Sequence, residues 1–168
     1  VLFSALGIPM YGIREIAKSR DNVKTRSIIT VELLLILFVT SVLSYLVIFG
    51  IFLNLQKFNN YRSLILVICP IIFLTNIGAE WFFQAIEDQL YITVRFLIVK
   101  AITLFMLFSM IDGPEDYLKY AFIMLVSTAG SNIFNFFYIK KYVDFKNISW
   151  KELSIRRHFK GILTIFLA

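Results

Sequence analysis

The sequence predicts an all-α protein, a polytopic bundle of transmembrane helices, from three observations. Hydrophobic residues make up 59% of the chain and charged residues only 17%, whereas a soluble domain carries about 25% charged residues. Several apolar runs reach the roughly 20 residues that a helix needs to cross a bilayer. The basic residues gather in alternate connections between these runs, which is typical of membrane proteins. We therefore expect a single membrane domain over residues 1–168.

The apolar runs give the expected elements in chain order. Full spans are expected at 28–53, 63–83, 90–111 and 117–139, and partial spans at 1–13 and 159–168. The two partial runs are too short to cross a bilayer alone. We therefore expect the sequence to be a fragment of a longer polytopic chain.

The segment 75–100 joins two of these runs and carries charge between them. Its aromatic and aliphatic residues recur at helical spacing, while Glu80, Gln84, Glu87 and Asp88 occupy the other side. This pattern predicts an amphipathic helix that lies on the membrane surface. The alternative is a polar loop flanked by aromatic belt residues.

Glycine and proline punctuate the runs. The turn at 112–115, DGPE, predicts a tight hairpin on the outer side. Pro9 and Pro70 lie inside apolar runs, where proline frees a backbone carbonyl and kinks a helix. Small residues at 127–131 predict a close approach of two helices.

The bias of Lys and Arg predicts the orientation. The segments 14–27 and 140–160 are rich in basic residues, and Arg95 falls on the same side. Lys57, Arg62 and Lys119 fall on the opposite side. Because basic loops stay in the cytoplasm, 14–27 and 140–160 are expected to be cytoplasmic. This placement accounts for the net charge of +6 without a nucleic-acid site.

Polar residues within the apolar runs are the candidate site. An ionisable group costs about 2.5–3.5 kcal/mol at the bilayer centre on insertion scales, so it usually faces a cavity or a partner. Lys100 could face a cavity or snorkel to the cytoplasm, and Glu32 could line a cavity or stabilise a helix N-terminus. Asn132 and Asn135 share a helix face and could bind a neighbouring helix. With Arg95, these residues predict a water-filled, cationic cavity open to the cytoplasm.

No catalytic or metal motif accompanies these residues. The sequence contains no Walker A loop, no H-E-x-x-H and no Cys/His cluster. Cys69 is the single cysteine, so no internal disulfide can form. His158, the single histidine, follows two arginines and is expected to be a solvated loop residue. We therefore expect no enzyme activity, no catalytic residue, no cofactor and no bound metal.

Two stretches resemble a known family. Residues 7–18, GIPMYGIREIAK, resemble the G-x-P-x-Y-G-x-R-E-I-A segment of bacterial polysaccharide flippases of the Wzx/RfbX type. Residues 76–87, NIGAEWFFQAIE, with YITVR at 91–95, resemble their G-x-[DE]-W-[FY]-[FY]-Q-[GA]-x-E segment. Glu80 stands where the family commonly has Asp. That family belongs to the multidrug/oligosaccharidyl-lipid/polysaccharide exporter superfamily.

The resemblance implies a fold and a function. Family members have 12–14 transmembrane helices in two lobes around a central cavity. This chain would then run from the second helix into the seventh, as part of the N-terminal lobe, and 140–160 would be the cytoplasmic connection between lobes. The implied function is to move an undecaprenyl-diphosphate-linked oligosaccharide from the cytoplasmic to the periplasmic leaflet of the bacterial inner membrane. By motif, only Arg14 and Arg95 carry over as groups that meet the substrate.

Three other functions remain open, one of which is a membrane scaffold that transports nothing. A cation-coupled drug exporter of the same superfamily would use Glu32 as its coupling carboxylate. A membrane polymerase or ligase that transfers sugars is a third reading, but the predicted outer loops are short for it. Expected partners are the lipid-linked oligosaccharide, membrane lipids and other polysaccharide-assembly proteins.

Overall fold

The computed structural model describes residues 2–51, 55–145 and 147–167, and every regular element in these ranges is a helix. Four helical segments are long and apolar enough to cross a membrane: Val23–Gly50, Gln56–Ala85, Gln89–Met110 and Pro114–Lys141. Three predicted span ends lie outside the described residues, at positions 1, 53 and 168. Residue 54, where the predicted connection begins, also lies outside them. The all-α membrane fold expected from the sequence is confirmed.

The N-terminal run forms two helices, α1 (Leu2–Ala5) and α2 (Ile8–Lys18). They are separated at Leu6 and Gly7, whose φ angles of 48° and 71° are left-handed and end α1. Pro9 lies in the first turn of α2, where its missing N–H costs no intrahelical hydrogen bond. The expected kink therefore falls before the proline.

The first long helix, α3 (Val23–Gly50), begins at a side-chain cap. Asn22 Oδ1 accepts a hydrogen bond from the Thr25 N–H at 3.0 Å, which satisfies one of the free donors at the helix start. The turn between α2 and α3 is thus shorter than the predicted connection 14–27. Four basic residues of that predicted connection lie within the two helices instead: Arg14 and Lys18 in α2, and Lys24 and Arg26 in α3.

The second spanning segment is broken into the 3₁₀ turn η2 (Gln56–Tyr61) and the helices α4 (Arg62–Ile68), α5 (Pro70–Ile77) and α6 (Glu80–Ala85). Pro70 separates α4 from α5, as the sequence predicts. The Tyr45 hydroxyl of α3 is inserted at this break. It donates to the Cys69 carbonyl at 3.1 Å and accepts from the Phe73 N–H at 3.3 Å, so a neighbouring helix restores the interrupted bond.

The prediction of a surface-lying helix over 75–100 is wrong. The segment divides into the end of α5, the short α6 and the first half of α7, with left-handed φ angles of 42° at Ala79 and 59° at Glu87 between them. Trp81, Phe82 and Phe83 are buried inside the protein. Their apolar surface faces α2 and α8 in place of lipid, which sequence periodicity alone cannot distinguish.

The third and fourth spans form a helical hairpin of α7 (Gln89–Met110) and α8 (Tyr117–Tyr138). Asp88 caps α7 through Oδ1, which accepts from the Tyr91 N–H at 3.4 Å. The turn contains the 3₁₀ helix η3 (Pro114–Asp116), where Asp116 accepts from the Asp112 N–H at 2.9 Å. The tight hairpin predicted at 112–115 is therefore confirmed.

The connection after α8 folds back along α3. It contains the 3₁₀ helices η4 (Ile139–Lys141) and η5 (Trp150–Glu152) and leads to α9 (Arg156–Leu167). Arg26 donates to the Tyr142 carbonyl at 2.8 Å, and Lys24 pairs with Glu152 at 2.8 Å. The connection is thus fastened to the N-terminal turns of α3.

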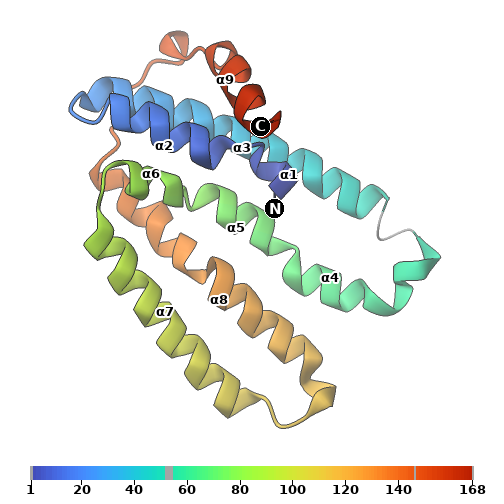
Figure 1. The fold of residues 1–168 in the computed structure, drawn as a ribbon. Coiled ribbons are helices and arrows are strands. Elements are labelled where there is room, and N and C mark those ends of the chain that lie inside the picture. The colour runs from blue at the N-terminus through green and yellow to red at the C-terminus, as the bar shows by residue number, and fades with distance from the viewer. Residues whose placement is uncertain (1, 52–54, 146, 168) are drawn as a thin grey trace.

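The helices form two groups joined through α5 (Figure 1). One group contains α1, α2 and α3, with α9 lying across α2. The other contains α7 and α8, and α5 contacts both α3 and α8. The buried core is richest where α2 ends and α3 begins, and it includes Ile16, Leu33, Phe82, Phe83 and Ile139. Long faces of α3, α7 and α8 remain apolar and exposed, as spans that contact lipid require.

Candidate functional site

The two segments that carry the family resemblance pack against each other. α2 contacts α6 closely, and a Cβ placed on Gly12 would lie 2.5 Å from Cε3 of the Trp81 ring. Arg20, just after α2, pairs with Glu87, just after α6, at 2.7 Å. Segments more than 60 residues apart in the sequence therefore form one contact, in which the glycine makes room for the indole.

An aromatic cluster extends this contact to α7 and α8. Tyr91 and Tyr138 stack with their ring centroids 4.0 Å apart and an interplanar angle of 18°, and the Phe83 ring lies 5.0 Å from Tyr91. The Tyr142 hydroxyl donates to Asp88 Oδ2 at 2.8 Å. Burial, and then hydrogen bonds with Tyr138 and Asp88, raise the pKa of the Tyr142 phenol, so it remains a donor at neutral pH.

Arg95 lies beside this cluster with its side chain only 5% exposed. Its guanidinium is 5.6 Å from the Tyr91 ring centroid, and Nη2 is 3.4 Å from Glu80 Oε2. Nε and Nη1 are buried and have no hydrogen-bond partner among the described residues. Because an unsatisfied buried donor of a charged group is costly, this position favours occupation by water or an anion.

Asn132 and Asn135 of α8 lie at the same level of the α7–α8 hairpin as Arg95. The antiparallel register of α7 and α8 follows from two contacts, the Tyr91–Tyr138 stack and the Lys100–Ser127 hydrogen bond. That register places Arg95 level with 132–135. Both asparagines are buried, Asn135 Nδ2 donates to Asn132 Oδ1 at 3.5 Å, and Asn135 Oδ1 lacks a partner among the described residues. Arg95 and the two asparagines are thus brought to one level of the hairpin.

Lys100 lies further along α7 and binds α8. Its Nζ donates to Ser127 Oγ at 2.7 Å and to the Ser127 carbonyl at 3.2 Å, and it lies 5.3 Å from the Phe96 ring centroid. The side chain is exposed at the surface of the hairpin. The observed partners of Lys100 are therefore a neighbouring helix and an aromatic ring.

Glu32 is fully buried and belongs to a different cluster, with α9. Its carboxylate accepts from the Ser154 N–H, from Arg157 and from His158, whose Nε2 lies 2.7 Å from Oε2. His158 is 2% exposed, so the prediction of a solvated loop histidine is wrong. An isolated acid inside an apolar run is itself a signal of a partner, but the partners of Glu32 are more than 120 residues away in the sequence.

Arg14 lies apart from both groups. It is on the exposed side of α2, pairs with Glu15 at 3.2 Å and lies 5.5 Å from the Tyr11 ring centroid. The six predicted site residues therefore divide in three: Arg95 with Asn132 and Asn135, Lys100 nearby on the hairpin surface, and Arg14 and Glu32 on the α2–α3 side.

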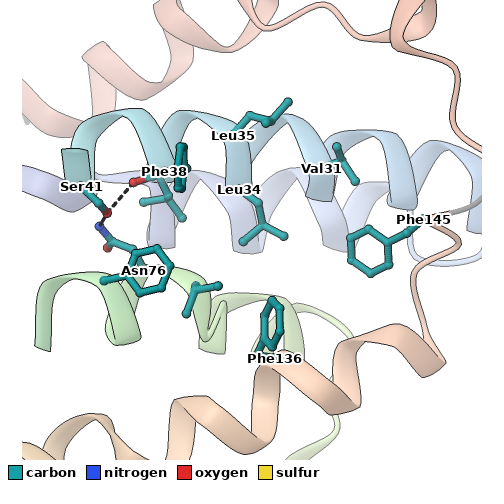
Figure 2. Close-up of a pocket in the computed structure, with 11 residues that line it drawn as sticks. Val31, Leu34, Leu35, Phe38, Ser41, Asn76, Phe136 and Phe145 are labelled. Atoms are coloured by element: carbon teal, nitrogen blue, oxygen red, sulfur yellow. Dashed lines mark hydrogen bonds between the residues drawn. The ribbon is translucent and has the colours of Figure 1, made fainter. Parts of the chain in front are cut away.

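An apolar pocket lies among α3, α5 and α8 (Figure 2). It has a volume of about 250 Å³ and is lined by residues of α3, α5 and α8 and by Phe145. At one end, Asn76 Nδ2 donates to Ser41 Oγ at 2.8 Å, as Figure 2 shows. None of the six predicted site residues lines it, so the cationic cavity stays a prediction. Over the described ranges, no group of three or more His, Cys, Asp or Glu residues could hold a metal ion.

Comparison with known proteins addresses the family directly. Residues 1–166 match the family described as "Polysaccharide biosynthesis protein". Searches of curated proteins and of solved structures gave no match. The match covers both motif segments, the aromatic cluster and α9, so the chain belongs to this polysaccharide biosynthesis family, the family of Wzx-type polysaccharide flippases.

Proposed function

We propose that this chain is part of the N-terminal lobe of a transporter in the bacterial inner membrane. The transporter moves an undecaprenyl-diphosphate-linked oligosaccharide from the cytoplasmic to the periplasmic leaflet by alternating access between two lobes. The observation that carries this proposal is the family match over residues 1–166. The spanning-capable helices and the biased basic residues support it.

Arg95 is the residue best suited to meet the diphosphate. Its guanidinium offers two donors without a partner among the described residues, and guanidinium groups bind phosphate oxygens in a bidentate manner. The carboxylate of Glu80, which is about half exposed, pairs only with Nη2 of Arg95. An incoming diphosphate could therefore accept from Nε and Nη1 while the Glu80 pair is retained.

The other predicted site residues take supporting roles in this proposal. Asn132 and Asn135 supply amide groups at the level of Arg95, and such groups can bind sugar hydroxyls. Lys100 adds positive charge further along α7, held by Ser127. Arg14 is exposed and could attract an anionic head group to the mouth of the site.

The contacts of Glu32 weigh against the cation-coupled drug exporter. A coupling carboxylate must be able to bind a proton or cation, but Glu32 is fully buried, its Oε1 accepts from the Ser154 N–H, and its Oε2 accepts from Arg157 and His158. This arrangement favours a structural ion pair over a site that exchanges cations.

The proposal is tested in cells by replacing Arg95. Arg95→Ala should stop surface polysaccharide and cause lipid-linked oligosaccharide to accumulate in the cytoplasmic leaflet, while Arg95→Lys keeps partial function because the charge persists. Lys57→Ala, an exposed basic residue on the predicted periplasmic side, is the matched control and should behave as wild type. Normal surface polysaccharide in Arg95→Ala, at normal protein abundance, would contradict the role of Arg95. Deletion of the whole protein should also cause lipid-linked oligosaccharide to accumulate in the cytoplasmic leaflet. A level equal to that of wild-type cells would contradict the function itself.

A further inference from the structure

The contact between α9 and the α2–α3 pair is built around a buried carboxylate. Glu32 of α3 and His158 of α9 are 0% and 2% exposed, and Tyr11 of α2 is 5% exposed. His158 bridges the other two, with Nε2 2.7 Å from Glu32 Oε2 and Nδ1 2.9 Å from the Tyr11 hydroxyl. One hydrogen-bonded chain therefore joins three helices.

The donors and acceptors of this hydrogen-bonded cluster are complementary. The Ser154 N–H donates to Glu32 Oε1, while Arg157 Nε at 3.0 Å, Arg157 Nη2 and His158 donate to Oε2. Both carboxylate oxygens therefore accept hydrogen bonds, Oε1 from one donor and Oε2 from three. With a hydrogen on Nε2, His158 donates to Glu32 while its Nδ1 accepts from the Tyr11 hydroxyl. An uncharged or donor-bearing side chain at position 32 would not fit this set of donors.

Close contacts of the backbone and an apolar contact accompany the polar cluster. Gly161 allows close approach, since a Cβ there would lie 2.4 Å from Cε2 of Tyr11, and the backbone of Phe166 passes 3.3 Å from a Cβ placed on Gly7. Ile162 is buried in the contact, but Phe159 and Leu163 remain more than half exposed on the other side of α9. The docked helix is thus fixed by a polar cluster and a narrow apolar contact.

We infer that Glu32, Tyr11, Arg157 and His158 form a latch that holds α9 against α2 and α3 and opens during the transport cycle. This inference rests on the proposed function, in which α9 follows the connection between lobes and moves with the second lobe. Glu32 lies nine residues after Val23, about 13 Å along α3 at about 1.5 Å per residue. This is the end of α3 expected to be cytoplasmic, so the latch would open and close at that end.

The chemistry of the cluster suits a reversible latch. When α9 separates, Glu32 and Arg157 can both be hydrated, because the Arg157 side chain is already 44% exposed. His158 and Tyr11 exchange their mutual hydrogen bond for water. The closed state is specific, since the donors converge on one carboxylate. The open state leaves no charge buried without a partner.

Thiol accessibility tests the latch independently of transport. A cysteine replaces Ile162 in a Cys69→Ser background, and a water-soluble maleimide is applied to inside-out vesicles. Glu32→Gln is expected to raise the labelling rate roughly tenfold or more, since it removes charge-assisted hydrogen bonds and opens the contact more often. Glu152→Gln, which breaks an exposed pair between the same connection and Lys24, is the matched control and should leave the rate near wild type.

Two further measurements separate a latch from a general structural role. A cysteine at Leu33, fully buried on α3, should label slowly with or without Glu32→Gln. If Glu32→Gln raised labelling at both positions, or at neither, the latch would be refuted. Arg157→Gln keeps the Glu32–His158 pair and should give a smaller increase. If the Glu32→Gln protein does not insert into the membrane, Arg157→Gln serves as the test. An unchanged labelling rate at position 162 in Arg157→Gln would then overturn the proposal.

Transport is measured in parallel on the same variants. Suppose that Glu32→Gln raises the labelling rate but the wild-type protein moves no lipid-linked oligosaccharide. This result would uphold the opening of α9 and contradict the proposed function. Normal transport together with unchanged labelling would contradict the latch alone.

Discussion

The contact between the two motif segments depends on the absence of a side chain at Gly12, so Gly12→Ala is expected to destabilise the protein. The new Cβ would lie 2.5 Å from Cε3 of Trp81 and 3.0 Å from Cδ2 and Cζ3. Carbon atoms in contact are normally about 3.5–4.0 Å apart. The indole or α2 must therefore move by roughly an ångström.

Neither can move freely. Trp81 is 4% exposed and packs edge-on against Phe82, which is fully buried. Overpacking a core typically costs about 1–3 kcal/mol, while replacing glycine by alanine within a helix returns about 0.5–1 kcal/mol. We expect a net loss of about 1–2 kcal/mol.

The measurement is the thermal unfolding midpoint in detergent, followed by loss of the monodisperse elution peak. Gly50→Ala is the matched control, because it also lies in a helix but a Cβ there meets no heavy atom within 4 Å. Gly12→Ala should unfold at a temperature several degrees lower than wild type, and Gly50→Ala at or above the wild-type temperature. Equal midpoints for the two variants would refute the close contact between α2 and Trp81.

Three other substitutions have definite expected results. Tyr45→Phe removes the acceptor of the Phe73 N–H and one of two donors to the Cys69 carbonyl at the Pro70 break, and it should lower the stability by about 1 kcal/mol in the same unfolding assay; an unchanged midpoint would show that the hydroxyl is dispensable. Lys100→Leu should abolish surface polysaccharide at normal abundance and Lys100→Arg should retain part of it, whereas normal production in Lys100→Leu would reduce the lysine to a partner of Ser127. A cysteine at position 147 in a Cys69→Ser background should resist impermeant thiol reagents in intact cells, and its periplasmic labelling would reverse the predicted orientation.

The spans were predictable because their signals are local. Hydropathy located the hairpin at 112–115 and the helices on both sides of it, and a proline predicted the break at Pro70. These features depend on residues close in the sequence. The insertion of Tyr45 into the break was not predictable, since it joins residues more than 20 positions apart.

The errors came from surfaces whose partner is distant. Trp81 and Phe82 form an apolar face that could contact lipid or protein, and the contacts of Trp81 with Gly12 in α2 and of Phe82 with Tyr142 decide between them. His158 resembled a loop residue because it follows Arg156 and Arg157, although its partner Glu32 is 126 residues earlier. The grouping of Arg95 with Asn135 likewise depends on the register of α7 and α8, which the sequence alone does not give.

Reconstitution tests the central claim most directly. The protein is placed in proteoliposomes that contain an undecaprenyl-diphosphate-linked oligosaccharide with a fluorescent label on its sugar, and external dithionite destroys the label on the outer leaflet. We expect the inner-leaflet fluorescence to decay with the wild-type protein and to persist with Arg95→Ala and in protein-free vesicles. If this fluorescence persists with folded, correctly inserted wild-type protein, the assignment as a lipid-linked oligosaccharide flippase is contradicted.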